Sequence, residues 1–133
     1  MKLKVFNYVD DLQEAIAFYQ KVFDATIGES YKNKDGTYSL AEVRVSRGTS
    51  FWLAARNGEG AEEGGAITGA VNTGNIMQLC LMYDKADVTK LEKAYNILKE
   101  GANMLWTLRS APWTSHTCDL IDKYGIRWCL MVD

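Results

Sequence analysis

The sequence is poor in the features that mark membrane-spanning, secreted or nucleic-acid-binding proteins. Its 133 residues include one proline, three cysteines and no block of lysine and arginine, and the formal net charge is −2. No apolar run approaches the roughly 20 residues that span a bilayer, and the first residues lead into a strand-like run and not a signal peptide. We therefore expect a cytoplasmic protein whose partner is neither a membrane nor a nucleic acid.

Cysteine and histidine are too few for the common metal-binding frameworks. Cys80, Cys118 and Cys129 are an odd number, lie in apolar strand-like segments and lack CxxC spacing, which predicts reduced thiols. His116 is the single histidine. The rest is ordinary globular composition, 47% hydrophobic and 24% charged, in a length that fits one domain.

The first part of the chain has strand-like and helix-like patterns in turn. Alternating polar and apolar residues predict a strand over residues 2–8. A capping-box-like start at Asp11 and an apolar stripe at helical spacing predict a helix that ends near Phe23. Runs with turn residues between them predict an antiparallel meander of three strands, over residues 26–32, 38–46 and 50–55.

The same pattern returns after a glycine-rich segment. Residues 56–74 lack periodicity and contain six glycines, as expected of a linker. A strand over 76–83 and a helix over 88–100, capped by Asp87 and closed by Gly101, follow. The turn at 122–125 separates the last two of three further strands, near 103–109, 115–121 and 126–132.

The order of one strand, one helix and three strands therefore occurs twice, with a repeat of about 75 residues. We expect a single α+β domain over residues 1–133, with module one at about 1–55, the linker at about 56–74 and module two at about 75–133. Two curved sheets leave a concave space, and clefts between repeated modules are common ligand sites. The pattern thus predicts two βαβββ modules that form curved mixed sheets around a cleft.

Three segments resemble a known family: AIAFYQKVFDA at residues 15–25, LAEV at 40–43 and DKYGIRW at 122–128. They are similar to motifs of the glyoxalase/bleomycin-resistance/dioxygenase superfamily, also called the vicinal oxygen chelate fold, and particularly of its PhnB-like branch. The resemblance spans nearly the whole chain. It implies a homodimer or paired modules with a cavity inside each curved sheet.

The resemblance also indicates where a metal would be held. Enzymes of the superfamily place His, Gln or Glu on the first and last strands of each half, where these residues bind a divalent metal. Only Gln78 and Cys129 have side chains that ligate, whereas a site for oxygen-rich substrates needs about three such ligands. We therefore expect no metal and no other cofactor. The matching positions are Leu3 or Lys4, Trp52 or Leu53, Met77 or Gln78, and Cys129 or Leu130.

One imidazole and two thiols are predicted to gather in module two. His116 and Cys118 are two apart on a strand, and the turn at 122–125 is expected to place Cys129 directly across from Cys118. Two interpretations stay open. One is a soft-metal or nucleophilic thiol site, and the other is packed strand residues with reduced thiols, the commoner environment of cysteine.

Aromatic and charged strand residues supply the remaining candidates. Tryptophan and tyrosine side chains would line a cavity that stacks a planar or cationic ligand, or would pack in the core. Alternation places Leu40, Glu42 and Arg44 on one face, where they would orient a polar ligand or form an exposed ion pair. The candidate ligand-binding residues are Tyr8, Leu40, Glu42, Arg44, Trp52, Gln78, Trp113, His116 and Cys129, and no catalytic residue is assigned.

These patterns favour a PhnB-like protein that binds a small molecule in an aromatic-lined cleft without the standard metal site. The alternative is a metal-dependent lyase, isomerase or dioxygenase with atypical ligands, drawn from Glu42, Gln78, His116 and Cys129. A glycine-rich turn that would hold a nucleotide or phosphate is missing from the sequence. Whether the protein is an enzyme stays open at this level.

Overall fold

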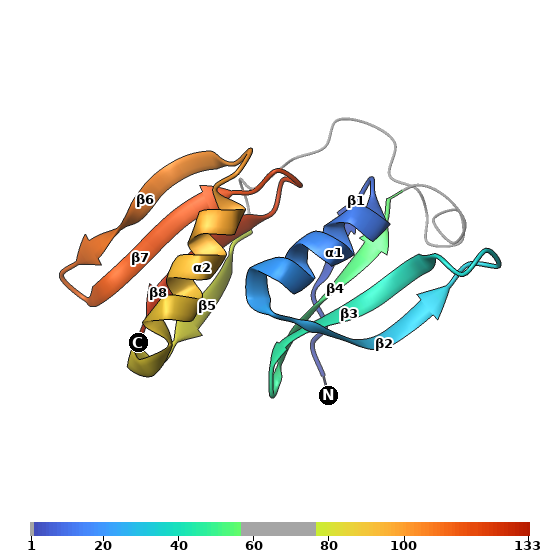
Figure 1. Ribbon diagram of the computed structural model, residues 1–133, viewed down its shortest axis with the longest axis horizontal. Helices are drawn as coiled ribbons and strands as arrows, with labels where there is room; N and C mark the ends of the chain where they lie inside the picture. Colours follow the sequence, from blue (N-terminus) through green and yellow to red (C-terminus); the bar gives the residue numbers. More distant parts are fainter. Residues whose placement is uncertain (1, 57–76) are drawn as a thin grey trace. The chain divides into compact units, whose positions relative to one another are not determined.

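A computed structural model describes residues 2–56 and 77–133 (Figure 1). The chain divides into two compact units, Met1–Gly69 and Ala70–Asp133. The linker predicted at residues 56–74 lies, apart from Arg56, outside the described residues. Each unit has the predicted order of one strand, one helix and three strands.

The first unit is a four-stranded sheet with one helix. Its elements are β1 (Phe6–Val9), α1 (Leu12–Phe23), β2 (Thr26–Lys32), β3 (Tyr38–Ser46) and β4 (Thr49–Ala55). The strand order is β1-β4-β3-β2, in which β1 runs parallel to β4 and the other neighbours are antiparallel. The predicted meander of β2, β3 and β4 is confirmed.

The second unit repeats this topology. Its elements are β5 (Leu79–Tyr83), a 3-10 turn η1 (Lys85–Asp87), α2 (Val88–Leu98), β6 (Asn103–Ala111), β7 (Thr114–Ile121) and β8 (Arg127–Val132), in the strand order β5-β8-β7-β6. Strand β5 is parallel to β8. The predicted α+β fold of two βαβββ modules with mixed sheets is therefore confirmed, while the cleft stays a prediction.

Two predicted boundaries and one predicted cap are corrected. The ladder with β4 begins at Phe6 and not at Lys2, preceded by Val5, whose carbonyl accepts from the Trp52 N–H at 2.8 Å. Helix α2 ends at Leu98, because the chain then turns toward the left-handed conformation of Gly101, at φ 71°. The Asp87 carboxylate does not cap the helix, since it pairs with the Lys90 ammonium at 2.9 Å.

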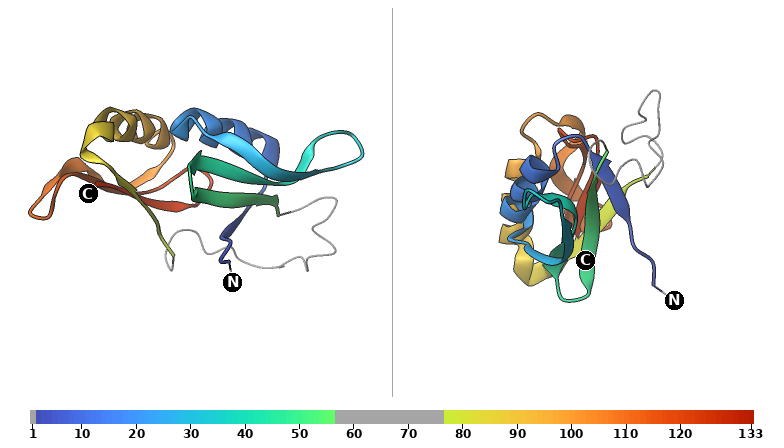
Figure 2. Two further views of the ribbon diagram at one scale, coloured as in Figure 1. Left: turned by 90° about the horizontal axis from the view of Figure 1, so that it is seen from below. Right: turned by 90° about the vertical axis from the view of Figure 1, so that its right-hand side faces the viewer.

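Each helix covers one face of its own sheet (Figure 2). The Asp11 carboxylate accepts the Glu14 N–H at 3.1 Å, as the predicted cap requires. Further along α1, Ile16 and Tyr19 pack in the core. The Tyr19 ring meets the Phe51 ring edge-on, with centroids 5.4 Å apart. The apolar stripe of α1 comprises Leu12, Ala15, Ile16, Tyr19, Val22 and Phe23, all buried.

A buried carboxylate organises the hairpin between β7 and β8. Asp122 is 4% exposed, and its Oδ1 accepts the backbone N–H groups of Tyr124 and Ile126 at 2.9 and 3.0 Å. Its Oδ2 accepts the indole N–H of the fully buried Trp128 at 2.8 Å. Together with Gly125 at φ 85°, these bonds form the predicted turn.

We expect Asp122→Asn to lower the free energy of unfolding by about 1.5–3 kcal/mol, because the amide nitrogen cannot accept the Trp128 indole N–H. Urea unfolding followed by tryptophan fluorescence measures the change. Asp35→Asn is the control, since Asp35 occupies an exposed turn, where its carboxylate accepts from Thr37. Equal stability of Asp122→Asn and the wild type would show that the buried carboxylate is dispensable.

Candidate functional site

The face of the first sheet opposite α1 carries polar side chains. On β3, the fully buried Ala41 and Val43 point toward α1, so Glu42 and Arg44 point away from it. Leu40 shares this face, as predicted, and is half-buried. The same alternation places Tyr8 on this face of β1, where its side chain is exposed.

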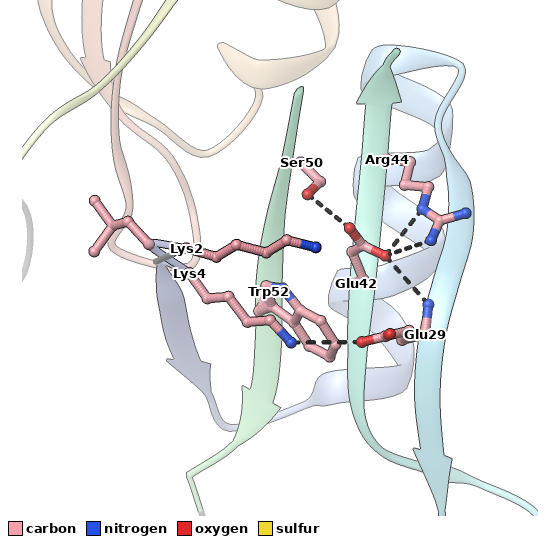
Figure 3. Close-up of a pocket in the computed structure, with 8 residues that line it drawn as sticks. Lys2, Lys4, Glu29, Glu42, Arg44, Ser50 and Trp52 are labelled. Atoms are coloured by element: carbon pink, nitrogen blue, oxygen red, sulfur yellow. Dashed lines mark hydrogen bonds and ion pairs between the residues drawn. The ribbon is translucent and has the colours of Figure 1, made fainter. Parts of the chain in front are cut away.

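A pocket of about 430 Å³ lies on this open face (Figure 3). Figure 3 shows the ammonium groups of Lys2 and Lys4 pointing into it beside the Trp52 indole. Three of its side chains are cationic and two are carboxylates. The lining residues are Lys2, Leu3, Lys4, Glu29, Glu42, Arg44, Ser50 and Trp52.

Four donors hold the Glu42 carboxylate. Its Oε1 accepts the Ser50 hydroxyl at 2.8 Å, and its Oε2 accepts the Glu29 backbone N–H at 3.2 Å. Oε2 also accepts Nε and Nη2 of Arg44, each at 2.9 Å. The Ser50 hydrogen bond is the largest cause that lowers the pKa of Glu42, with smaller contributions from Glu29 and Arg44. Glu42 is therefore a fixed negative charge at neutral pH.

A β-bulge makes room for this arrangement. The pairs Ile27 with Val43 and Ser30 with Ala41 leave two residues of β2, Gly28 and Glu29, opposite Glu42. A Cβ on Gly28 would meet the Glu42 carboxylate and the Arg44 guanidinium, with its Cζ only 2.6 Å away. Glycine at this position therefore allows the ion pair to lie across β2.

Two side chains already contact the ring face of the Trp52 indole. The Phe6 ring stacks on it with centroids 5.3 Å apart, and Lys4 Nζ lies 4.3 Å from its ring centroid. The Lys4 ammonium also lies 3.4 Å from Glu29 Oε2. Because Trp52 is only 4% exposed, little of its ring surface is open for a ligand to stack on.

The pocket residues do not fit the divalent metal that the fold suggests. Lys4 and Trp52 occupy two of the positions expected to hold ligands, and they contact each other as a cation and an aromatic ring. Neither side chain offers a lone pair to a metal at neutral pH. Within residues 2–56 and 77–133, no group of three or more His, Cys, Asp and Glu side chains is placed to hold an ion.

The prediction of a thiol cluster in the second unit is wrong, because the register of β7 and β8 differs from the expected one. Cys129 pairs with Asp119, and Cys118 pairs with Leu130, so Cys129 and Cys118 point to opposite faces of the sheet. Cys118 is fully buried beneath α2, where burial raises the pKa of its thiol to about 11. His116 lies on the α2 face with its Nε2 3.7 Å from Glu92 Oε1.

The other candidates of the second unit lie on its own strands and turns. Gln78 is exposed just before β5. Trp113 is exposed in the turn between β6 and β7. Trp106 is partly exposed and carries the Arg109 guanidinium 3.8 Å from its ring centroid, whereas Trp128 belongs to the core.

Sequence reasoning missed Lys2, Glu29, Ser50 and the role of Gly28. The available signal was a glycine inside a predicted strand, which marks a bulge or a close approach. It also missed a tripeptide, Cys-Leu-Met, that occurs at residues 80–82 and again at 129–131. No helix in the described part of the chain is long and apolar enough to cross a membrane.

The order and pairing of the strands and helices define the class of the fold: an α+β protein built of two βαβββ modules. The model of the Glyoxalase/Bleomycin resistance protein/Dioxygenase superfamily matches residues 4–130, and the chain belongs to this superfamily. The predicted resemblance is thus confirmed. No curated protein matches the chain.

Solved structures of the same fold are distant in sequence. The PhnB protein from Bacillus cereus is 20% identical with a TM-score of 0.75, and the match covers 100% of both chains. Protein PA1353 from Pseudomonas aeruginosa is 15% identical with a TM-score of 0.70, over 99% of this chain and 98% of that one. FosX from Listeria monocytogenes, a fosfomycin resistance protein solved with Mn(II) and sulfate, is 15% identical with a TM-score of 0.63, over 100% and 92%.

We expect Ser50→Ala to raise the pKa of Glu42, because it removes the strongest of the hydrogen bonds that lower it. A carboxylate whose folded pKa is lowered stabilises the fold above its unfolded pKa, near 4.3, and this stability is lost as the pH falls through the folded pKa. The variant should therefore be less stable than the wild type at pH 7, and the difference should narrow below about pH 4.

Carboxyl NMR titration of Glu42 and urea unfolding at several pH values measure the two effects. Ser39→Ala is a matched control, since the Ser39 hydroxyl donates to the Tyr31 carbonyl and does not touch Glu42. An unchanged Glu42 titration in Ser50→Ala would contradict the assignment of this hydrogen bond.

Proposed function

We propose that the protein binds a small anionic molecule in the pocket on the open face of the first sheet, without the standard metal of its superfamily. The observation that carries the proposal is the unequal charge of the pocket. Lys4 is paired with Glu29 and Arg44 with Glu42, which leaves the Lys2 ammonium without an ion pair among the described residues. An anionic group would complete this arrangement.

The pocket favours a ligand with one compact anionic head, such as a carboxylate, phosphate or phosphonate. Lysine binds such a group as a mobile point charge, while the fixed Glu42 repels a second, separate anionic group on the ligand. Trp52 and Leu3 also line the pocket, so the remainder of the ligand would contact apolar side chains. The site is therefore a charged pocket with one aromatic edge, in place of the aromatic-lined cleft suggested by composition.

Nothing in the donor set of the pocket supports the alternative of a metal-dependent lyase, isomerase or dioxygenase. Polarising vicinal oxygens needs several imidazole or carboxylate ligands on one ion. Here Glu42 has its oxygens occupied by Ser50, Glu29 and Arg44, and Lys4 would repel a cation. The proposal thus assigns these residues to ligand binding.

The proposal includes a homodimer, which the family resemblance suggests. Several large apolar side chains of the second unit are solvent-exposed, which supports association with a partner surface. They are Met77, Met82, Leu105, Trp106 and Trp113.

Titration with benzoate and phenylphosphonate, followed by Trp52 fluorescence and amide NMR shifts, tests the pocket. We expect both anions to bind and neutral benzamide not to bind. Lys2→Met should weaken anion binding by roughly three- to tenfold, since it removes the unpaired charge while keeping the length of the side chain. Lys21→Met, at an exposed position of α1, is the control and should bind as the wild type does.

A second variant tests the same pocket by adding a Cβ at Gly28, next to the Arg44–Glu42 pair. Gly28→Ala should displace the Arg44–Glu42 pair and change the anion affinity, while circular dichroism should report an intact fold. Equal binding of benzamide and benzoate would overturn the proposal. So would stoichiometric zinc, nickel, iron or manganese in the purified protein that is lost in Cys129→Ala, because it would support the enzymatic alternative.

A further inference from the structure

The open face of the second sheet carries four sulfur-containing side chains. The tripeptide Cys-Leu-Met occurs on both β5 and β8, and these strands run parallel in a register that pairs Cys80 with Cys129 and Met82 with Met131. Leu130, between Cys129 and Met131, is fully buried. The two cysteines and two methionines therefore project together from the face opposite α2.

Two of the four sulfur atoms lie at the separation expected of two ligands on one ion. Cys80 Sγ lies 3.9 Å from Met82 Sδ on the same strand. Two sulfurs bound to one tetrahedral ion lie about 3.8 Å apart when each metal–sulfur bond is about 2.3 Å. Strand spacing of about 4.8 Å brings the second pair within reach of the flexible methionine side chains.

The two thiols also interact with each other. Partial burial, followed by the hydrogen bond and the charge interaction with Cys129, raises the pKa of the Cys80 thiol to about 11. Cys80 is exposed and Cys129 partly exposed, so an ion can reach them from solvent.

Neighbouring polar groups suit a site that becomes anionic. The Thr117 hydroxyl lies 3.9 Å from Cys129 Sγ, where it can donate to a thiolate. Arg127, two residues before Cys129, holds Asp119 through bonds of 3.0 and 2.6 Å. Asp119 lies opposite Cys129, so this pairing neutralises the one carboxylate at that register position.

We propose that Cys80, Met82, Cys129 and Met131 form a binding site for one soft monovalent metal ion of the copper(I) class. Thiolate and thioether sulfur select copper(I), whereas zinc binds thiolates but has little affinity for thioethers. Binding displaces the thiol protons to solvent and forms metal–sulfur bonds, and the copper stays monovalent throughout. The site shares no residue with the anion pocket and does not rest on the proposed function.

Competition with the chelator bicinchoninate under anaerobic, reducing conditions tests the site on the full chain. We expect one copper(I) per chain, with an affinity that rises with pH because thiol protons are released. Cys80→Ser and Cys129→Ser should each weaken binding at least tenfold, and Met82→Leu and Met131→Leu less strongly. X-ray absorption of the copper-loaded wild type should show sulfur ligands and no nitrogen.

Cys118→Ala and Met104→Leu are the controls, because they remove sulfur from outside the four-sulfur cluster. Circular dichroism of every variant establishes that it is folded, and the X-ray absorption of the wild type needs no substitution. The proposal is overturned if the wild type retains no copper(I) against the chelator. It is equally overturned if zinc binds as tightly as copper(I), or if Cys118→Ala weakens binding as much as Cys80→Ser.

Discussion

The parallel pairing of the first and last strands of each unit is the constraint on which the rest depends. Two parallel neighbours cannot be joined by a hairpin, so the chain must cross over one face of the sheet, and the helix α1 or α2 makes this crossing. Every second side chain of each strand then packs against the apolar stripe of the helix. The remaining side chains face away from the helix. They are not needed to fill the core, so they can be polar or can bind a ligand.

The two units use this freedom differently. Glu42 lies opposite Trp52 in the first sheet, and Asp119 lies opposite Cys129 at the matching place of the second. Arginine neutralises both carboxylates, Arg44 from the same strand and Arg127 from the neighbouring one. Around these equivalent pairs, the first face collects lysines and the second collects sulfur, so a duplicated scaffold presents two unlike surfaces.

Local periodicity made the helices, the meander and the shared face of Leu40, Glu42 and Arg44 predictable from sequence. Register was harder, because a one-residue difference in the β7–β8 hairpin moved Cys129 away from Cys118. The positions of Lys2, Ser50 and Glu29 in the pocket depend on how the strands pair and on the bulge at Gly28. The pairing of Cys80 with Cys129 was missed because it needs the parallel register of β5 and β8.

The bulge at Gly28 and Glu29 has a further consequence, since β2 is an outer strand of its sheet. An outer strand with regular hydrogen-bonding groups is a template onto which another chain can add. The extra residue breaks that regularity, and the register shifts of β6 do the same at the outer edge of the second sheet. The irregularity that shapes the pocket around Glu42 therefore also makes this edge of the sheet a poorer template for edge-to-edge aggregation.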